Sequence, residues 1–248
     1  MGNKVVGTTS VKLGIYETST DTQLAGMVGD KKEFEDGRVF RLCQNGETAL
    51  VAGILVQSIV SLASDDSLEI ATSQAIGDYE VNVTGDATSV HAAHTLAGGY
   101  LVMSDTAGDI GTFYKIKDNA AIASGANGII TLYDPLTTAI VAGTNECSIC
   151  VNPYSGVIKD ANTAQLVGVP LIAVAASTST VPVFFWALCE GYGPATATAV
   201  AISAGDYLEH SAGSVALITT GDIEALVAVA VTAFAASEAG IVKYIAMG

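Results

Sequence analysis

Basic side chains are scarce in this sequence. Its 248 residues include 10 Lys and Arg against 25 Asp and Glu, which gives a formal net charge of -15 at pH 7. A phosphate backbone would be repelled by so acidic a protein, so we expect no nucleic-acid partner. An acidic surface also serves solubility alone, and that interpretation stays open.

Long apolar runs are missing as well. The nearest approach, residues 49–63, is interrupted by Gly53 and by three polar residues, and it falls short of the roughly 18 uninterrupted apolar residues of a membrane helix. We therefore expect a soluble protein with no membrane partner. The first ten residues, MGNKVVGTTS, lack the apolar core of an export signal, so we expect no export.

Cysteine is too sparse for a disulfide framework, which favours a reducing, cytoplasmic site of assembly. Cys147 and Cys150 form a C-x-x-C pair, but Pro153 follows too closely for the helix that a redox motif of the thioredoxin type would open. A zinc site needs four ligands, and Cys43 and Cys189 are isolated. We expect structural cysteines, with the sulfurs of the pair on opposite faces of a strand.

Catalytic motifs are absent too. There is no nucleophile elbow, P-loop or dinucleotide fingerprint, and residues 191–194 (GYGP) are interpreted as a turn. The acidic residues at 65–66 and 105–109 lack the spacing of a calcium loop and allow at most a weak surface calcium site. The sequence predicts a non-enzymatic protein with no catalytic residue, no metal and no cofactor.

The three histidines are interpreted as loop residues. His91 and His94 are three residues apart, and a metal pair is the less favoured alternative because their sequence neighbours offer few carboxylates. His210 is expected in a solvated turn.

What the sequence does contain is a recurring unit of a small residue, a glycine and a β-prone run. It occurs at residues 52–56, 76–81, 98–102, 127–130, 204–208 and 239–242. Each unit is typical of a turn that leads into a strand, and the irregular spacing excludes a solenoid. We predict a mainly β protein, with short antiparallel strands in one or two β-sandwich or barrel-like subdomains and an extended N-terminal arm.

The expected division is an arm at 1–33, a β subdomain at 34–153 and a C-terminal β subdomain at 154–248. The Ala-rich stretch 223–236 could be helical, but its β-branched residues favour a strand.

Residues 36–58, DGRVFRLCQNGETALVAGILVQS, contain two turn signals, Asp36-Gly37 and Asn45-Gly46, around a predicted strand at 38–43. Alternation places Arg38, Phe40 and Leu42 on one face of that strand and Val39, Arg41 and Cys43 on the other. Each face combines one cation with apolar groups, which indicates a strand covered on both sides. Residues 48–52 fit a helical turn or a strand equally well.

This stretch resembles the opening of a group of tailed-bacteriophage virion proteins, the head decoration or cement proteins. GGYLVMSDTAGDIGTFYKIKDNAA (98–121), followed by LYDPL and VNPYSGV, and FFWALCEGYGPATA (184–197) resemble the same group. The chain departs from the group at Phe184-Phe185-Trp186, where relatives usually read Tyr-Gly-Trp.

The resemblance implies a virion structural protein on the outer capsid surface, assembled in the host cytoplasm. It would bind the major capsid protein across capsomer boundaries and associate with itself, usually as a homotrimer. The alternative is a minor capsid, tail-fibre or host-surface-binding (adhesin or glycan-binding) virion component. A hydrolase would need a sheltered carboxylate pair, which the sequence does not offer.

Charge suggests which residues would contact the shell. Residues 1–41 hold six basic and six acidic side chains, whereas residues 42–248 hold four and nineteen. The candidate capsid or subunit contacts are Lys4, Lys12, Lys31, Lys32, Arg38, Phe40 and Arg41. We expect one of Arg38 and Arg41 to be a contact and the other to support the fold, and we expect deletion of residues 2–30 to leave a folded body that no longer binds.

Overall fold

The computed structural model describes residues 11–60, 62–86, 88, 90–104, 111–218, 226–245 and 247. Strands account for 44% of the structure and helices for 4%. Every pair of named strands is antiparallel. The expected mainly β fold is therefore confirmed. Within the described ranges, no helix has the length and apolar character needed to cross a membrane.

The chain forms two compact units. Unit 1 consists of the chain up to Val60 together with the chain from Pro153 onward, and unit 2 is Ser61–Asn152. Unit 2 is an insertion in the chain of unit 1, because the strands that flank it, β3 (Val56–Gln57) and β10 (Ile158–Lys159), pair with each other.

The expected subdomain 34–153 is not one body. The boundary at Pro153 agrees with the prediction, but residues 34–60 belong with the C-terminal part of the chain. The physical reason is strand pairing across the insertion, which short-range sequence patterns do not reveal.

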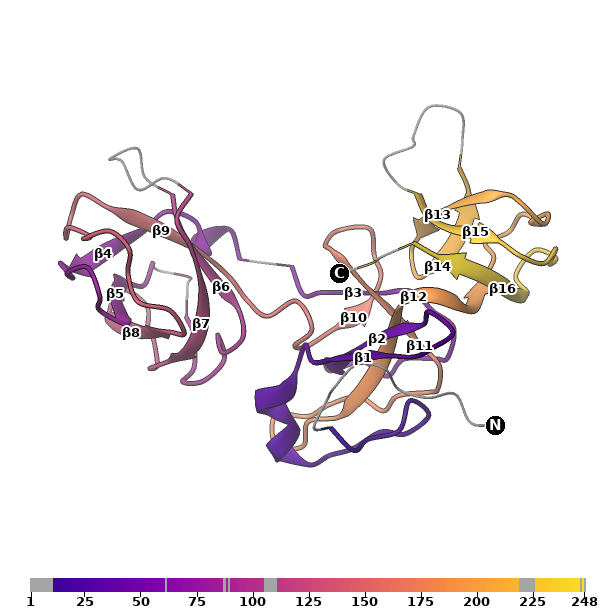
Figure 1. Ribbon diagram of the computed structural model, residues 1–248, viewed down its shortest axis with the longest axis horizontal. Coiled ribbons are helices and arrows are strands. Elements are labelled where there is room, and N and C mark those ends of the chain that lie inside the picture. Colours follow the sequence, from indigo (N-terminus) through magenta and orange to yellow (C-terminus); the bar gives the residue numbers. More distant parts are fainter. Residues whose placement is uncertain are drawn as a thin grey trace. The chain divides into compact units, whose positions relative to one another are not determined.

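Unit 1 contains a long antiparallel sheet (Figure 1). Its order is β10-β3-β11-β12-β16-β15-β13-β14, with β2 on β12 and β1 on β2. The remaining strands are β1 (Lys31–Glu33), β2 (Val39–Gln44), β11 (Leu166–Pro170), β12 (Phe184–Thr196), β13 (Tyr207–Ser211), β14 (Ser214–Leu217), β15 (Leu226–Ala230) and β16 (Ala239–Tyr244).

Strand β12 is the centre of unit 1. Its first half pairs with β2 and β11, and its second half pairs with β16. Alternating side chains of β2 and β12 enter two different cores: Phe40 and Trp186 lie in one, and Cys43 and Phe185 in the other. The predicted strand with both faces covered is confirmed, since Phe40, Leu42 and Cys43 are all fully buried.

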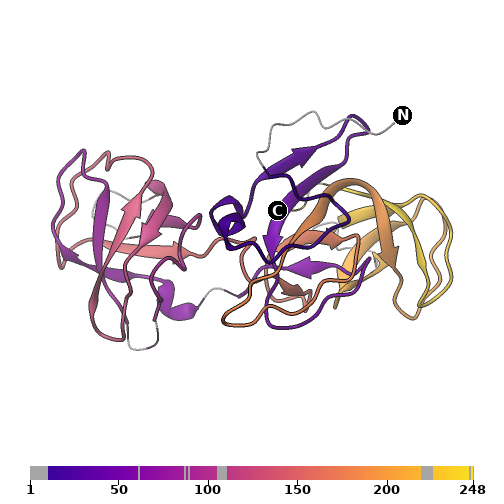
Figure 2. The same ribbon diagram turned by 90° about the horizontal axis from the view of Figure 1, so that it is seen from below.

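Residues 11–33 are an integral part of unit 1 and do not form a free arm. Val11 is buried in the larger core, the indole nitrogen of Trp186 donates to the Leu13 carbonyl at 2.9 Å, and Ser19 pairs with Phe184. A 3₁₀ helix, η1 (Thr22–Met27), then leads toward β1 (Figure 2). The predicted arm at 1–33 is wrong for these residues, because alternating apolar positions at the start of the segment fill the core.

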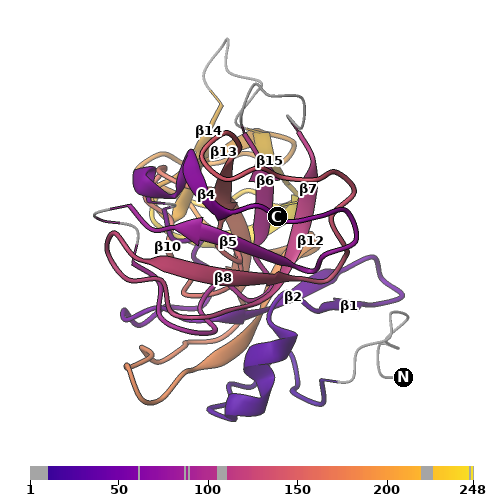
Figure 3. The ribbon, with the colours of Figure 1, turned by 90° about the vertical axis from the view of Figure 1, so that its left-hand side faces the viewer.

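Unit 2 is a closed six-stranded barrel around one core. Figure 3 shows the curvature of its strands. The order is β4-β5-β8-β7-β6-β9, and the β4–β9 pair closes the ring. A short 3₁₀ helix, η2 (Ala63–Asp65), precedes β4 (Leu68–Thr72), β5 (Glu80–Thr84), β6 (Tyr100–Met103), β7 (Phe113–Asn119), β8 (Asn127–Leu132) and β9 (Glu146–Cys150).

Three local predictions have different outcomes: one is wrong, one is met by neither of its alternatives, and one is confirmed. Residues 191–194, predicted as a turn, continue β12, where Gly191 adopts a positive φ of 95° and Pro194 lies opposite Ile241. Residues 48–52 form neither a helix nor a continuous strand, and Leu50 makes an isolated bridge to Val174. The described part of 223–236 contains β15, so the strand interpretation is confirmed there.

Candidate functional site

Two of the predicted contact residues are buried inside unit 1. Phe40 is fully buried, and Lys32 is only 7% exposed. The Lys32 ammonium donates to the Leu13 carbonyl at 2.7 Å and lies 4.4 Å from the ring centre of Trp186. Burial lowers the pKa of Lys32, partly opposed by Glu17. Neither residue can touch a partner, so both predictions are wrong.

Arg41 serves the fold. It is half-buried, its guanidinium donates to the Gly29 carbonyl at 3.0 Å, and it lies 5.6 Å from the ring centre of Tyr154. Lys12 and Lys31 are exposed, and Lys31 pairs with Glu33 at 2.9 Å. Lys4 lies outside the described residues.

Arg38 is held in one orientation at the surface. Its Nε donates to a carboxylate oxygen of Asp36 at 2.7 Å, and the other oxygen of that carboxylate accepts the Arg38 backbone N–H at 3.1 Å. The guanidinium carbon lies 5.4 Å from the ring centre of Phe34 and 5.8 Å from that of Phe40. Such contacts fix the group in advance, which reduces the entropy lost when it binds an anion.

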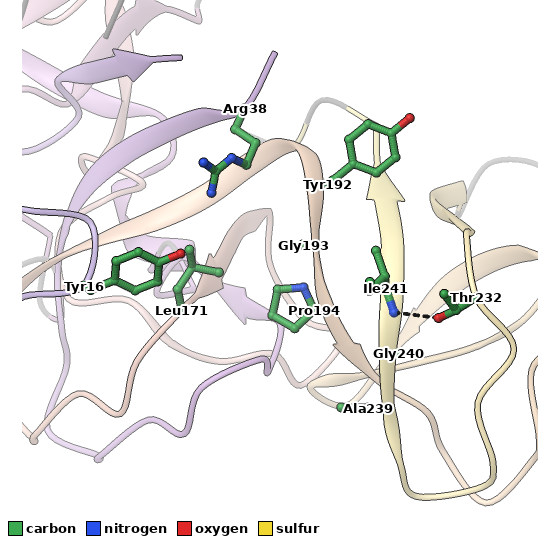
Figure 4. A pocket seen from close by; sticks show the side chains of 10 residues that line it. All are labelled: Tyr16, Arg38, Leu171, Tyr192, Gly193, Pro194, Thr232, Ala239, Gly240 and Ile241. Atoms are coloured by element: carbon green, nitrogen blue, oxygen red, sulfur yellow. Dashed lines mark hydrogen bonds between the residues drawn. The ribbon is translucent and has the colours of Figure 1, made fainter. Parts of the chain in front are cut away.

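This arginine lies at the edge of an apolar pocket of about 600 Å³. Figure 4 shows the guanidinium pointing into the pocket, with Tyr16 and Leu171 on one side and Tyr192 and Ile241 on the other. The volume is within the range of roughly 300–1,000 Å³ that is typical of ligand pockets. The lining residues are Tyr16, Arg38, Leu171, Tyr192, Gly193, Pro194, Thr232, Ala239, Gly240 and Ile241.

Strand register explains why apolar groups face the solvent here. Pro194 of β12 lies opposite Ile241 of β16, and Tyr192 lies opposite Lys243, so these side chains share the outer face of the strand pair. Tyr192 and Ile241 are each 51% exposed.

Two glycines let this strand pair lie flat on the core. A Cβ on Gly193 would come within 2.2 Å of the Leu188 side chain, and one on Gly240 would come within 2.0 Å of the Phe234 ring. The floor of the pocket is therefore backbone that is supported from behind by buried side chains.

Sequence reasoning found Arg38 but missed the pocket. Its walls come from residues as far apart as Tyr16 and Ile241, and no local pattern joins them. The only available signal was Gly191-Tyr192-Gly193-Pro194, where alternating glycines in a β context indicate close packing on one face.

Unit 2 has an exposed aromatic face of a different kind. Tyr100 and Phe113 stack with ring centres 4.9 Å apart, and Phe113 is 61% exposed. Lys115 lies 5.9 Å from the ring centre of Tyr133, which is 53% exposed. We call these four residues the aromatic face of unit 2.

Two of the three histidines, His91 and His94, each contact an aspartate that is distant in sequence. His91 is buried against Asp65 at 2.8 Å, whereas the exposed His94 contacts Asp118 at 2.8 Å. This hydrogen bond is the main cause that lowers the pKa of Asp118. The two imidazoles therefore belong to separate pairs.

The prediction for the third histidine, His210, is wrong. His210, expected in a solvated turn, is half-buried in β13 and lies 3.3 Å from the fully buried carboxylate of Asp160.

Cysteine placement follows the predicted alternation. Cys147 is buried and Cys150 is exposed at opposite faces of β9, as expected. Burial raises the pKa of Cys147 and of Cys189 to about 12, and it raises that of Cys43 well above its ordinary value. No group of three or more His, Cys, Asp or Glu that could hold a metal ion occurs among the residues that the structure describes.

No protein-family model, curated protein or solved structure matches the chain.

Proposed function

We propose that this protein is a non-enzymatic structural component of a tailed-phage virion. It decorates and stabilises the outer surface of the capsid by binding the major capsid protein across capsomer boundaries. The sequence resemblance supports this role, and its three segments contain strands of both units: β2 and β12 in unit 1, and the β6–β7 pair in unit 2.

The observation that carries the proposal is the Arg38 pocket. It combines exposed aromatic and aliphatic groups with an oriented guanidinium on a protein whose net charge is -15. Apolar burial provides affinity and a charge pair provides orientation, which is what an adhesive contact requires.

Many weak contacts suffice for such a protein. A shell presents its binding sites in a symmetric array, and association of the decorating copies, proposed here as a homotrimer, links several contacts. Linked contacts raise the effective concentration of each one, so a modest contact per copy gives a durable coat.

The proposal is tested by adding the purified full chain to undecorated heads and imaging them by cryo-electron microscopy. We expect additional regular density on the outer surface, and many copies of the chain per purified virion. Heads that stay bare at saturating protein concentration would reject the proposal.

A second candidate is a host-surface-binding virion component. It is favoured by the aromatic face of unit 2, because exposed aromatic rings present flat apolar surfaces and Lys115 adds hydrogen-bond donors. Copy number separates the candidates: a fibre or adhesin would be present in few copies per virion, whereas a decoration protein would be present in many.

A further inference from the structure

We propose that the Arg38 pocket binds an acidic, apolar peptide segment of the shell protein. One bulky apolar side chain enters between Tyr16 and Tyr192, and an adjacent carboxylate pairs with the terminal nitrogens of Arg38. The identity of the partner rests on the proposed function, whereas the chemistry of the ligand rests on the pocket alone.

The apolar half of the ligand follows from the walls. Tyr16 is 64% exposed, Tyr192 and Ile241 are each half exposed, and all three border one concavity with Leu171 and Pro194. Single exposed apolar residues are ordinary, but three that border one hollow together with the half-buried Leu171 and Pro194 mark a binding surface. A volume of about 600 Å³ accommodates an inserted side chain and part of its backbone.

The acidic half follows from Arg38. Its Nε is occupied by Asp36, and the structure records no further hydrogen bond of this guanidinium among the residues it describes. The two terminal nitrogens are free to form the parallel pair of bonds that a carboxylate accepts. Asp36 and the rings of Phe34 and Phe40 keep the group in place before the ligand arrives.

The charged residues around the pocket also favour an acidic ligand. No acidic residue lines the pocket, although unit 1 contains fourteen Asp and Glu. Lys243, opposite Tyr192 in the register, is exposed and makes no ion pair within the described residues, so a second cation lies on this face. An anionic segment is therefore favoured over a neutral or basic one.

Other ligand classes fit less well. A nucleic acid would bring many phosphates to an acidic protein and would leave the apolar walls without a role. A neutral apolar ligand would gain nothing from the oriented guanidinium and would partly desolvate it.

The chemistry is tested on the full chain with two probe peptides, N-acetyl-Leu-Glu-amide and its uncharged counterpart N-acetyl-Leu-Gln-amide. Binding is followed by NMR through the methyl groups of Ile241 and the ring of Tyr192. We expect both groups to shift and the Glu peptide to bind about tenfold more tightly than the Gln peptide.

Substitutions test whether Arg38 causes the preference for the Glu peptide and whether the apolar wall contributes to the binding of both peptides. R38Q removes the charge at similar length and should abolish the preference for the Glu peptide, while R38K should restore only part of it. I241T should weaken both peptides equally, because it changes only the apolar wall. K117Q removes an exposed cation of unit 2 and should change nothing. Equal binding of the two peptides by the unaltered chain, or absence of shifts at Ile241 and Tyr192, would overturn the inference.

A parallel measurement separates this inference from the proposed function. The unaltered chain, R38Q, I241T and K117Q are each sedimented with undecorated heads, after thermal melts confirm that each variant is folded. Loss of binding by R38Q and I241T alone supports both proposals. Undiminished binding by both variants overturns the inference and leaves decoration standing.

Two further outcomes are informative. If the unaltered chain ignores the heads but still selects the Glu peptide, decoration is rejected and the pocket chemistry stands. If Arg38 instead proves necessary for self-association in sedimentation velocity, the occupant is a second copy of this chain, and the assignment to the shell protein is overturned.

Discussion

Unit 1 and unit 2 are both antiparallel β structures, yet they bury their apolar side chains differently. In unit 2 the six strands close into a ring around one core, so backbone donors and acceptors pair around the barrel. In unit 1 the sheet follows an open path, and the strand pair β2–β12 is covered by a separate core on each face.

The two units also differ in their balance of basic and acidic residues. Unit 1 contains eight basic and fourteen acidic residues, whereas unit 2 contains two and eleven. The closed barrel needs no other segment to complete its core. The open sheet depends on residues 11–33 and leaves the outer side of β12 and β16 as an apolar surface beside a cation. We therefore expect unit 1 to carry the binding and to be the more sensitive to truncation.

The largest expected effect is that of deleting residues 2–30. The deletion removes Val11 from the core and the Leu13 carbonyl that accepts from Trp186, so we now expect unit 1 to lose its folded structure. Hydrogen exchange should show unprotected amides in β2 and β12 and intact protection in β7 and β8. A deletion variant with a protected β12 would restore the view of this segment as a free arm.

The next effect is that of Trp186→Ala. The side chain is 1% exposed at the centre of unit 1, and truncation of a buried aromatic residue typically costs about 3–5 kcal/mol. Urea unfolding followed by circular dichroism should show the unit 1 transition at lower denaturant and that of unit 2 unchanged. Phe113→Ala, at an exposed ring of unit 2, is the control and should change stability by less than about 0.5 kcal/mol. Equal losses in the two variants would contradict the distinction between core and surface.

Cysteine reactivity should differ by about a hundredfold within β9, because only thiolates accessible to the reagent react. Cys150 is exposed, whereas Cys147, with a pKa raised to about 12, remains a buried thiol at pH 8. An Ellman assay on the folded chain should count one fast thiol, and four after denaturation. A second fast thiol that persists in C150S and is lost in C147S would show that β9 opens in the native state.

The smallest effect is that of His94→Gln. The His94 contact lowers the pKa of Asp118, so the pair stabilises the fold above the ordinary carboxyl pKa, and this contribution is lost as pH falls through the lowered value. We expect the Asp118 pKa, measured by carboxyl NMR, to rise in the variant. Stability at pH 7 should change by less than about 0.5 kcal/mol, because the pair is solvent-exposed. An unchanged Asp118 pKa would show that the contact is not formed in solution.

Sequence patterns predicted local structure well. Alternation at 38–43 identified a strand covered on both sides, and the spacing of Cys147 and Cys150 placed their sulfurs on opposite faces. Both results depend only on the two-residue period of a strand. The pairing of β2 with β12, about 140 residues apart, does not follow from any period, and the insertion of unit 2 was missed for that reason.

Charge counting predicted the candidate site less well. Lys32 and Phe40 were assigned as contacts because they lie in the neutral segment, but the backbone directs both side chains inward. A count of charges contains no information on direction. The Arg38 pocket depends on tertiary structure, since four of the six segments that border it are more than ten residues from any other.

The account is tested most directly by comparing Arg38→Gln with Lys115→Gln in co-sedimentation with undecorated heads. Each substitution removes one cation, the first at the pocket of unit 1 and the second at the aromatic face of unit 2. The account predicts that Arg38→Gln weakens binding at least about tenfold at moderate salt, whereas Lys115→Gln binds like the unaltered chain. Normal binding by Arg38→Gln together with loss of binding by Lys115→Gln would contradict it and would assign attachment to unit 2.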